Sequence, residues 1–383
     1  MTTSPLTPRI LLLGATGYIG GTVLHHLLDS THPLLGEHAI SVLVRGPDRV
    51  AELKEAYGDR ISPVLYSGLD DIDLITKLAS QHDIVVNAGT GFHPASAEAL
   101  VHGLSRRLHE ESGGETRRPW IIHTSGCSNI SDNPIAGDSH PDRWFDDADS
   151  VSVYEHEKAV NARVPYLQRT AELAVIDAGE ETGVGAVVLQ IPAIFGQGRG
   201  LFSDSPTLLG VQVQYVLEHG YGFMVGDGTG RLGVVHIEDL AQLYVLIVQR
   251  ILDDGVKGVP SGKHGIVFPC VGLVQFADLA KGCVEAALRK GVLPKSDGPQ
   301  TEYVRFADVD EIALYYGGGD LGRHLVELCW AGHWNTKGTV AGQLGWLPLH
   351  DRDEYMSEKH FDSELEAILA GRVLHLDSVT GQK

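Results

Sequence analysis

Short runs of consecutive apolar residues alternate with longer amphipathic stretches through the first half of the chain. Apolar runs without polar alternation are typical of strands that are buried on both faces of a parallel sheet. The stretches between them have the length and the spacing of helices. The predicted strands are Ile10–Leu13, Ile40–Val44, Ser62–Tyr66, Asp83–Asn87, Trp120–Thr124 and Ala186–Ile191, and the predicted helices are Tyr18–Asp29, Arg49–Tyr57, Asp71–Ser80 and Ala95–Glu111.

This regular alternation predicts an α/β fold with a doubly wound parallel sheet of the Rossmann type. The rhythm breaks over Ser128–Pro165, a stretch rich in Pro, Asp and Ser that ends in a short predicted helix. Because long insertions in a compact sheet are usually functional or irregular, we expect a loop at the rim of an active site. After Ile191 helices predominate, which indicates a smaller and mostly helical C-terminal lobe.

Composition excludes several classes of protein. The 383 residues carry a net charge of −20, whereas nucleic acids and anionic lipid surfaces attract a cationic footprint. The four cysteines form no CxxC pair, so we expect neither a disulfide framework nor a zinc ribbon, and a cytoplasmic location fits best. No apolar run reaches the roughly 18 residues that a membrane span needs. The histidines show no HExxH or ligand spacing, and we expect no metal.

Glycine is unusually frequent, at 46 residues, and several glycines follow predicted strands. The first strand runs directly into a turn that contains Gly14, Gly17 and Gly20, and a helix follows at once. Such glycines permit a tight turn, a close approach to a pyrophosphate at the helix N-terminus, and close packing of helix on strand. The pattern predicts a dinucleotide site, whose first segment consists of Gly14, Thr16, Gly17, Tyr18, Ile19 and Gly20.

Residues after the next strands extend this predicted site. Arg45 ends the second strand, where a carboxylate would bind a ribose 2′-hydroxyl and an arginine suits a 2′-phosphate, so we expect NADP in preference to NAD. Leu69 and Asp70 follow the third strand and are expected near the adenine. The segment Asn87, Ala88 and Gly89 follows the fourth strand and is expected along the ribose and the diphosphate.

Six segments of the chain, in order, resemble those of the extended short-chain dehydrogenase/reductase superfamily, of the NAD-dependent epimerase/dehydratase type. They are GATGYIGG, NAGTG, Ile122–Gly126, Ile191–Gly196, Val235–Leu240 and Leu344–Pro348. The strand end His123-Thr124-Ser125-Gly126 is similar to an atypical branch that is common among fungal sequences. The resemblance implies that Thr124 lies at the cofactor and that Pro192 and Ile194 wall the nicotinamide.

The family's chemistry uses a tyrosine, a lysine four residues later, and a serine or threonine after the fifth strand. Tyr154 and Lys158 have that spacing, with Ser125 or Thr124 as the hydroxyl, but Tyr154 precedes the sixth strand by more residues than the family's tyrosine does. Counting back without gaps places Val164 and Gln168 at the two family positions.

Three alternatives therefore stay open for the catalytic group. The first is a displaced pair of Tyr154 and Lys158. The second is Tyr166, with Arg169 as the nearby positive charge. The third is that no such tyrosine catalyst operates.

The resemblance implies a dinucleotide-binding Rossmann domain over 8–200, to which 231–270 contribute, and a substrate-binding lobe over 201–230 and 271–383. We expect an NAD(P)-dependent oxidoreductase that acts on a carbonyl or alcohol of a small organic molecule. An epimerase or dehydratase that keeps its NAD(P) bound, and a non-catalytic sensor resembling the NmrA-like regulators, are the alternatives. The expected partner is a small-molecule substrate, with no nucleic acid and no membrane, and a homodimer is possible.

Overall fold

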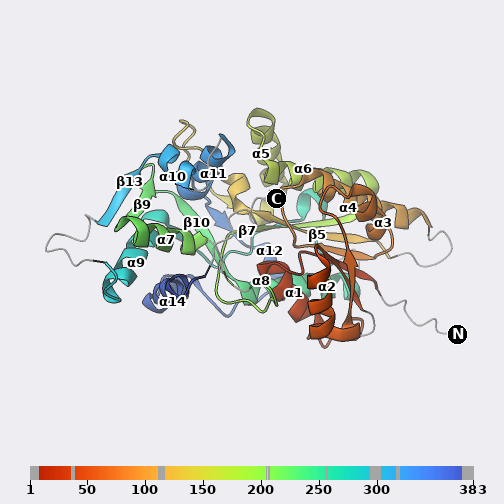
Figure 1. The fold of residues 1–383 in the computed structure, drawn as a ribbon. Coiled ribbons are helices and arrows are strands. Elements are labelled where there is room, and N and C mark those ends of the chain that lie inside the picture. The colour runs from red at the N-terminus through yellow and green to blue at the C-terminus, as the bar shows by residue number, and fades with distance from the viewer. Residues whose placement is uncertain are drawn as a thin grey trace.

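A seven-stranded sheet, all of whose strands are parallel, organises the chain (Figure 1). The computed structural model describes residues 8–35, 39–110, 117–203, 205, 208–254, 258–293, 303–315 and 320–372. The strand order is β11-β7-β5-β4-β1-β2-β3, so the chain starts in the middle of the sheet and winds outward in both directions. The strands are β1 (Ile10–Leu13), β2 (Ile40–Val44), β3 (Ile61–Leu65), β4 (Ile84–Asn87), β5 (Trp120–Gly126), β7 (Gly185–Ile191) and β11 (Ile266–Val267).

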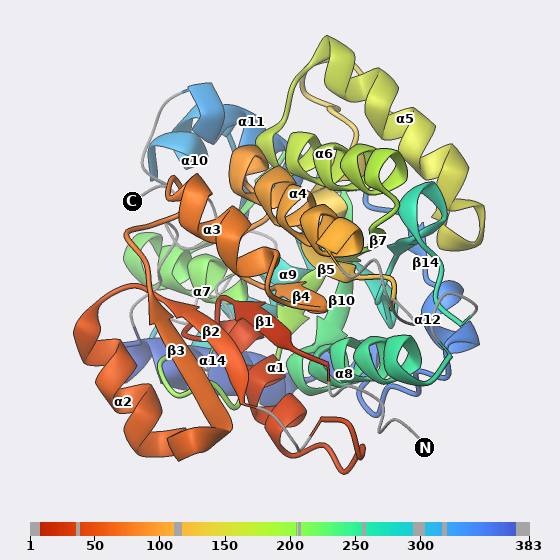
Figure 2. The same ribbon diagram turned by 90° about the vertical axis from the view of Figure 1, so that its right-hand side faces the viewer.

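Helices cover both faces of this sheet, which is why its central strands are apolar throughout (Figure 2). One apolar core lies between the sheet and α3, α4 and α6, and a second lies between the sheet and α1, α2 and α8. These helices are α1 (Tyr18–Leu28), α2 (Pro47–Tyr57), α3 (Ile72–Ala79), α4 (Pro94–Glu110), α6 (Leu167–Thr182) and α8 (Ile237–Asp254), with the short 3-10 turns η1 (Gly58–Arg60) and η5 (Gly262–His264) beside them.

The predicted α/β class and the doubly wound parallel sheet are confirmed. The predicted strand Ser62–Tyr66 lies one residue earlier, at Ile61–Leu65, and the predicted helix Ala95–Glu111 is observed at Pro94–Glu110. These shifts are small because the apolar run defines the centre of each element better than its ends.

The stretch after β5 is more ordered than the expected loop. It contains η2 (Cys127–Ile130), β6 (Phe145–Asp146), η3 (Asp147–Asp149) and α5 (Ser150–Arg163), a helix of 14 residues. Helix α5 packs on α6 and next to β11, and it buries Val153, Tyr154 and Glu157. The helix predicted at the end of this stretch is confirmed, and it is 14 residues long because its apolar residues pack on α6.

The later part of the chain forms three small sheets and several helices, of which α7, α9, α10, α11 and α14 lie at the left of Figure 1. The sheets are β12-β10-β8, β13-β9 and β14-β6. Their strands are β8 (Ala193–Phe195), β9 (Gly222–Val225), β10 (Arg231–His236), β12 (Gly272–Gln275), β13 (Val304–Ala307) and β14 (Thr336–Lys337). The helices are α7 (Leu208–His219), α9 (Phe276–Arg289), α10 (Val309–Tyr315), α11 (Asp320–Trp330), α12 (Val340–Gln343), α13 (Arg352–Tyr355) and α14 (Glu358–Leu369).

This later part differs from the sequence-based expectation mainly in its strands. Strands β9, β12 and β13 have four residues each, too few for periodicity to distinguish them from loops. The domain boundaries that the sequence suggested stay a prediction. Among the described helices, none combines the length and apolar character that a membrane crossing requires.

Candidate functional site

The glycine-rich turn lies at the carboxyl edge of the sheet, between β1 and the start of α1. Gly14 has a φ of +85°, and a Cβ there would lie 2.2 Å from the carbonyl oxygen of Ala88. A Cβ on Gly20 would lie 2.2 Å from the carbonyl oxygen of Gly14. The backbone amide of Gly17 donates to that same Gly14 oxygen at 2.8 Å. These contacts leave no room for side chains, so the turn packs backbone against backbone at the N-terminus of α1.

The segment after β8 lies against the start of α1. The hydroxyl of Tyr18 donates to the carbonyl oxygen of Gly196 at 2.5 Å, and the amide of Arg199 donates to Thr22 Oγ1 at 3.1 Å. The predicted wall residues Pro192 and Ile194 precede this segment directly, and Ile194 is half-buried. The hydrogen bonds therefore bring the second predicted segment of the cofactor site against the first.

Two arginines stand at the rim beyond β2. Arg45 and Arg49 are both exposed, and Arg49 donates from Nη1 to Thr16 Oγ1 at 3.3 Å while its guanidinium lies 5.5 Å from the ring centre of Phe202. Sequence reasoning missed Arg49, although its position in the first turn of the helix after Arg45 could have indicated it. Arg45 and Arg49, which we call the rim, thus bring two positive charges together on a chain that is acidic as a whole.

Other predicted cofactor residues have side chains that are already engaged. Asn87 Nδ2 lies 3.0 Å from His123 Nδ1 in the buried interior, and the hydroxyl of Thr124 is hydrogen-bonded to that of Tyr244 on α8. Leu69 is half-buried and Asp70 is fully exposed, with Asp70 Oδ1 3.2 Å from His93 Nε2. The side chains of Asn87 and Thr124 are therefore bonded to other parts of the protein.

The pair Tyr154 and Lys158 lies at the opposite edge of the sheet from the glycine turn. Tyr154 donates to Asp177 Oδ1 at 2.5 Å, and Lys158 Nζ donates to the Tyr154 hydroxyl at 2.8 Å. Asp177 belongs to the second half of α6, which leads into the amino end of β7, and Lys263, just before β11, lies 4.9 Å from the Tyr154 ring. Burial and the Asp177 bond raise the pKa of Tyr154, opposite to what a base with an acidified phenol requires.

Tyr166 lies at the correct edge, at the N-cap of α6. Its hydroxyl is 3.1 Å from Ser128 Oγ, which in turn donates to Gln168 Oε1 at 2.8 Å. The Tyr166 ring packs edge-on against Phe92, which follows the NAGTG turn, and the Arg169 guanidinium lies 5.7 Å from its centre. The structure thus brings Tyr166 next to the end of β5, together with Ser128, which sequence reasoning did not single out.

Ser125 points into a buried polar network beneath this edge. Its hydroxyl accepts from Asn129 Nδ2 at 3.0 Å and bonds to Glu172. Gln190 Nε2 donates to both Glu157 and Glu172, at 2.6 and 2.7 Å. The two carboxyl groups also bond to each other, which requires a shared proton, and burial raises the pKa of both, most strongly that of Glu157.

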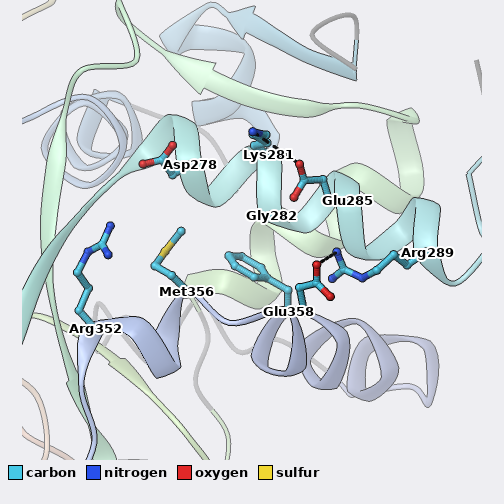
Figure 3. Close-up of a pocket in the computed structure, with 9 residues that line it drawn as sticks. Asp278, Lys281, Gly282, Glu285, Arg289, Arg352, Met356 and Glu358 are labelled. Atoms are coloured by element: carbon cyan, nitrogen blue, oxygen red, sulfur yellow. Dashed lines mark ion pairs between the residues drawn. The ribbon is translucent and has the colours of Figure 1, made fainter. Parts of the chain in front are cut away.

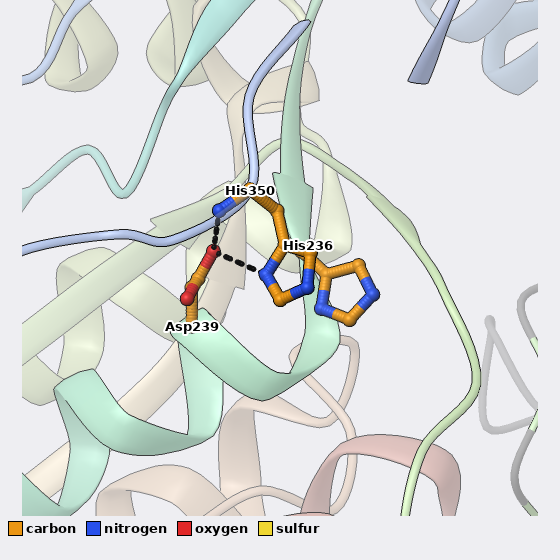
Figure 4. A group of neighbouring side chains, drawn as sticks. All are labelled: His236, Asp239 and His350. Carbon is orange, nitrogen blue, oxygen red and sulfur yellow. Dashed lines mark hydrogen bonds and ion pairs between the residues drawn. The ribbon is translucent and has the colours of Figure 1, made fainter. Parts of the chain in front are cut away.

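Asp239 holds the start of α8 to the segment that follows α12 (Figure 4). Its carboxylate accepts from the amides of Leu349 and His350, each at 2.9 Å, and from His350 Nδ1 at 3.0 Å. The His350 ring stacks on His236 at a centroid distance of 3.6 Å, and His236 Nδ1 accepts from the Glu238 amide.

Ligand atoms of His236, Asp239 and His350 lie within 4.8 Å of one another, a spacing that a metal ion could use. The carboxylate of Asp239 is nevertheless fully engaged by three N–H donors, and one His236 nitrogen is engaged too. Burial, together with His350, lowers the pKa of His236 to about 4, so its imidazole is neutral near pH 7. We therefore interpret the cluster as a structural latch, in which Asp239 ties the start of α8 to the segment that contains Leu349 and His350.

A hollow of about 290 Å³ lies between α9 and the helices α13 and α14 (Figure 3). Its charges are paired, Lys281 with Glu285 along α9 at 3.7 Å and Arg289 of α9 with Glu358 of α14 at 3.8 Å. None of its lining residues comes from the carboxyl edge of the sheet, so this hollow is separate from the candidate site.

Comparisons with known proteins confirm the fold. No protein-family model matches the chain. The oxidase ucsJ from an Acremonium species is 27% identical over 328 residues, which is 82% of this chain and 88% of that protein. An uncharacterized protein of Saccharomyces cerevisiae is 25% identical over 279 residues, 71% of this chain and 78% of its own.

Two solved structures illustrate the structural likeness. A double mutant of the dTDP-glucose 4,6-dehydratase DesIV from Streptomyces venezuelae, with NAD and DAU bound, has a TM-score of 0.60 at 13% identity, covering 95% of this chain and 98% of its own. Vestitone reductase from alfalfa has a TM-score of 0.52 at 18% identity, covering 95% and 99%. The chain therefore has the fold of extended short-chain dehydrogenase/reductase proteins of the epimerase/dehydratase type, as its motifs predicted. The assignment to a fungal branch stays a prediction.

The first prediction concerns the shared proton of Glu157 and Glu172. A raised pKa in the folded state means that the protonated pair stabilises the fold below about pH 4.5 and that this contribution is lost as pH rises toward the folded pKa. Glu157→Gln keeps the hydrogen bonds without needing a proton, so its stability relative to the wild type should increase from pH 6 to pH 9 in urea denaturation.

Two further variants complete this test. The double variant Glu157→Gln/Glu172→Gln leaves the buried Arg169 without an anion and should lose about 3 kcal/mol. Glu155→Gln, an exposed change on the same helix, serves as the control. A pH profile of Glu157→Gln parallel to that of the wild type would contradict a shared proton.

The second prediction concerns the latch at Asp239. Asp239→Ala leaves two part-buried backbone amides and one imidazole without an acceptor, and we expect a loss of about 3 kcal/mol in the free energy of unfolding. Asp353→Ala, at a carboxylate that is 85% exposed, should change it by less than about 0.5 kcal/mol. Urea denaturation of both variants measures the difference, and equal stabilities would show that the latch contributes nothing.

Proposed function

We propose that this protein is an NAD(P)-dependent oxidoreductase that acts on a carbonyl or alcohol group of a small organic molecule. The observation that carries the proposal is the contact of Gly14 with Ala88 and of Gly20 with Gly14, which packs backbone against backbone at the N-terminus of α1. A Cβ at either glycine would clash with backbone, so the residues present fit a diphosphate bound by amides. The fold shared with DesIV, which was crystallised with NAD, supports the same assignment.

The rim supports a preference for NADP over NAD. Arg45 and Arg49 place two guanidinium groups where β2 ends and α2 begins, and Arg49 touches Thr16 of the glycine turn. Guanidinium groups bind phosphate through charge-assisted hydrogen bonds, whereas a ribose hydroxyl calls for a carboxylate. Since the chain as a whole carries a net charge of −20, which repels a phosphate, the attraction at this edge must come from local groups such as these arginines.

When bound, the nicotinamide supplies a hydride to the substrate carbon or accepts one from it. The chain itself must then bind the substrate and move a proton to or from its oxygen. Tyr166 is the acid that we assign to this step, because it lies beside the end of β5 at the same edge as the glycine turn. Tyr154 and Lys158 are bonded to Asp177 near the opposite edge and take no part.

Two other functions would use the same cofactor site. The fold is shared with dehydratases and epimerases, so a net non-redox reaction is one of them. A dinucleotide sensor without turnover is the other, and the neutral Gln168 at the position of the family's lysine favours it. Turnover measurements separate these functions from the proposed reductase.

The third prediction concerns the dinucleotide. NADPH should bind more tightly than NADH, as measured by the fluorescence of the reduced nicotinamide. Arg45→Ala/Arg49→Ala should weaken NADPH binding roughly tenfold or more and leave NADH binding almost unchanged, because only the 2′-phosphate loses its partners. Lys54→Ala removes an exposed positive charge from the same helix α2 and serves as the control. Equal losses for both dinucleotides would contradict the assigned role, and absence of any binding would overturn the proposed function.

The fourth prediction concerns turnover. Purified protein with NADPH should reduce at least one member of a panel of ketones and aldehydes, followed at the absorbance of the reduced nicotinamide. Tyr166→Phe should lower kcat by about 100-fold because the acid is removed, while Tyr154→Phe should change it by less than about twofold. A large loss in Tyr154→Phe with none in Tyr166→Phe would exchange the two assignments. Tight binding without turnover across the panel would favour the sensor.

A further inference from the structure

A short segment after β8 lies across the first turn of α1. Residues 196–202, which we call the strap, begin where the Tyr18 hydroxyl donates to the Gly196 carbonyl oxygen at 2.5 Å. In the middle of the strap, the amide of Arg199 donates to Thr22 Oγ1 at 3.1 Å. Two hydrogen bonds, which join positions 178 and 177 residues apart, therefore fix the strap to α1.

Backbone meets backbone where the strap crosses this turn. A Cβ on Gly21 of α1 would lie 2.7 Å from the Cα of Gly200, and a Cβ on Gly200 would lie 3.3 Å from the carbonyl oxygen of Gly17. Because glycines stand on both sides, the strap lies directly on the helix with no side chain between the two. This close approach determines where the residues that follow Gly200 lie.

Phe202 ends the strap against the guanidinium of Arg49. The guanidinium carbon lies over the ring, 5.5 Å from its centre, and Arg49 Nη1 donates to Thr16 Oγ1 at 3.3 Å. Phe202 is half-buried and packs on the apolar core that lies on the α1 side of the sheet, whereas Arg49 is exposed. The ring is thus the more firmly held of the two partners.

Contact with this ring limits the positions that the Arg49 guanidinium can take. An unrestrained arginine side chain has many rotamers, and a ligand that binds it must offset the loss of this freedom. Stacking on an aromatic face uses the plane of the guanidinium and leaves the N–H groups at its edge for an anion. The bond to Thr16 directs this edge toward the glycine turn, where the diphosphate is proposed to bind.

We propose that Phe202 is a positioning residue for the dinucleotide, because it holds the guanidinium of Arg49 where the ribose 2′-phosphate of NADP binds. The proposal rests on the proposed function and deepens it. The preference for NADP then depends on the strap as well as on the residues at the end of β2. The class of ligand recognised is an adenosine that carries a 2′-phosphate.

The first test measures the binding of the 2′-phosphate without turnover. Isothermal titration calorimetry compares adenosine 2′,5′-bisphosphate with adenosine 5′-monophosphate, which lacks the 2′-phosphate. Phe202→Leu removes the ring face and should weaken binding of the bisphosphate about three- to tenfold, and that of the monophosphate less than about twofold. Phe202→Tyr keeps the ring and should bind both probes as the wild type does. Leu201→Ala changes an exposed neighbour and serves as the control.

A double-mutant cycle shows whether the ring acts through the arginine. In an Arg49→Ala background, Phe202→Leu should no longer weaken binding of the bisphosphate, because no guanidinium is left to orient. An undiminished loss in that background would overturn the proposal. Equal losses for the two probes, or full affinity for the bisphosphate in Phe202→Leu, would overturn it as well.

The contact can also be detected with no ligand present. The Nε–H resonance of Arg49, assigned by its loss in Arg49→Lys, should be shifted by the ring current of Phe202. Phe202→Leu should move this resonance, and Leu201→Ala should not. Circular dichroism and thermal melts confirm that each variant is folded. An unmoved resonance in folded Phe202→Leu contradicts the proposal.

Failure of this proposal and failure of the proposed function give different results. A wild type that binds both adenosine probes equally well would overturn the role of the rim and of Phe202, and it would leave the oxidoreductase standing. A wild type that binds neither probe and no dinucleotide would overturn the proposed function itself, and the role of Phe202 with it.

Discussion

The close approach of backbone to backbone at Gly14 is the constraint on which the arrangement of this protein depends. The turn after β1 can touch the end of β4 only because no side chain intervenes, and α1 can begin at once only because Gly20 has none either. This contact brings the end of the central strand, the N-terminus of a helix and the turn after the neighbouring strand to one point. The walls of the candidate site then follow from short connections at that same edge of the sheet.

A second constraint is the insertion of α5 between β5 and α6. Helix α5 covers α6 and places Glu157 opposite Glu172 in a fully buried position. This burial requires the two carboxyl groups to share a proton. It also completes a polar network that fixes Ser125, Asn129 and Gln190 beneath the carboxyl edge of the sheet. The same helix carries Tyr154 and Lys158 away from that edge, although their spacing is that of a catalytic pair.

The charges along the carboxyl edge of the sheet divide the candidate site into a positively charged part and an uncharged part. The chain is strongly acidic, and the exposed arginines at the end of β2 and the start of α2 make a local cationic rim suited to a phosphate. Farther along the edge, buried hydroxyls and a carboxamide are hydrogen-bonded to one another, and the arginine near them is engaged by a backbone carbonyl. The exposed arginines match the charged dinucleotide that we propose for this edge.

The sequence by itself determined the fold class and the glycine turn that we propose as the first segment of a cofactor site. Uninterrupted apolar runs are buried wherever they occur, and the glycines of the first turn act within a few residues of one another, so both are readable locally. It also carried the spacing of Tyr154 and Lys158, which is local and therefore says nothing about the edge of the sheet at which the pair would lie. Only the tertiary structure decided that Tyr166 meets Ser128, because α6 and the end of β5 are brought together by packing across about 40 positions of sequence. Gln168 acquires its place in the same way, since Gly91 and Gly126 make room for it from two different strands.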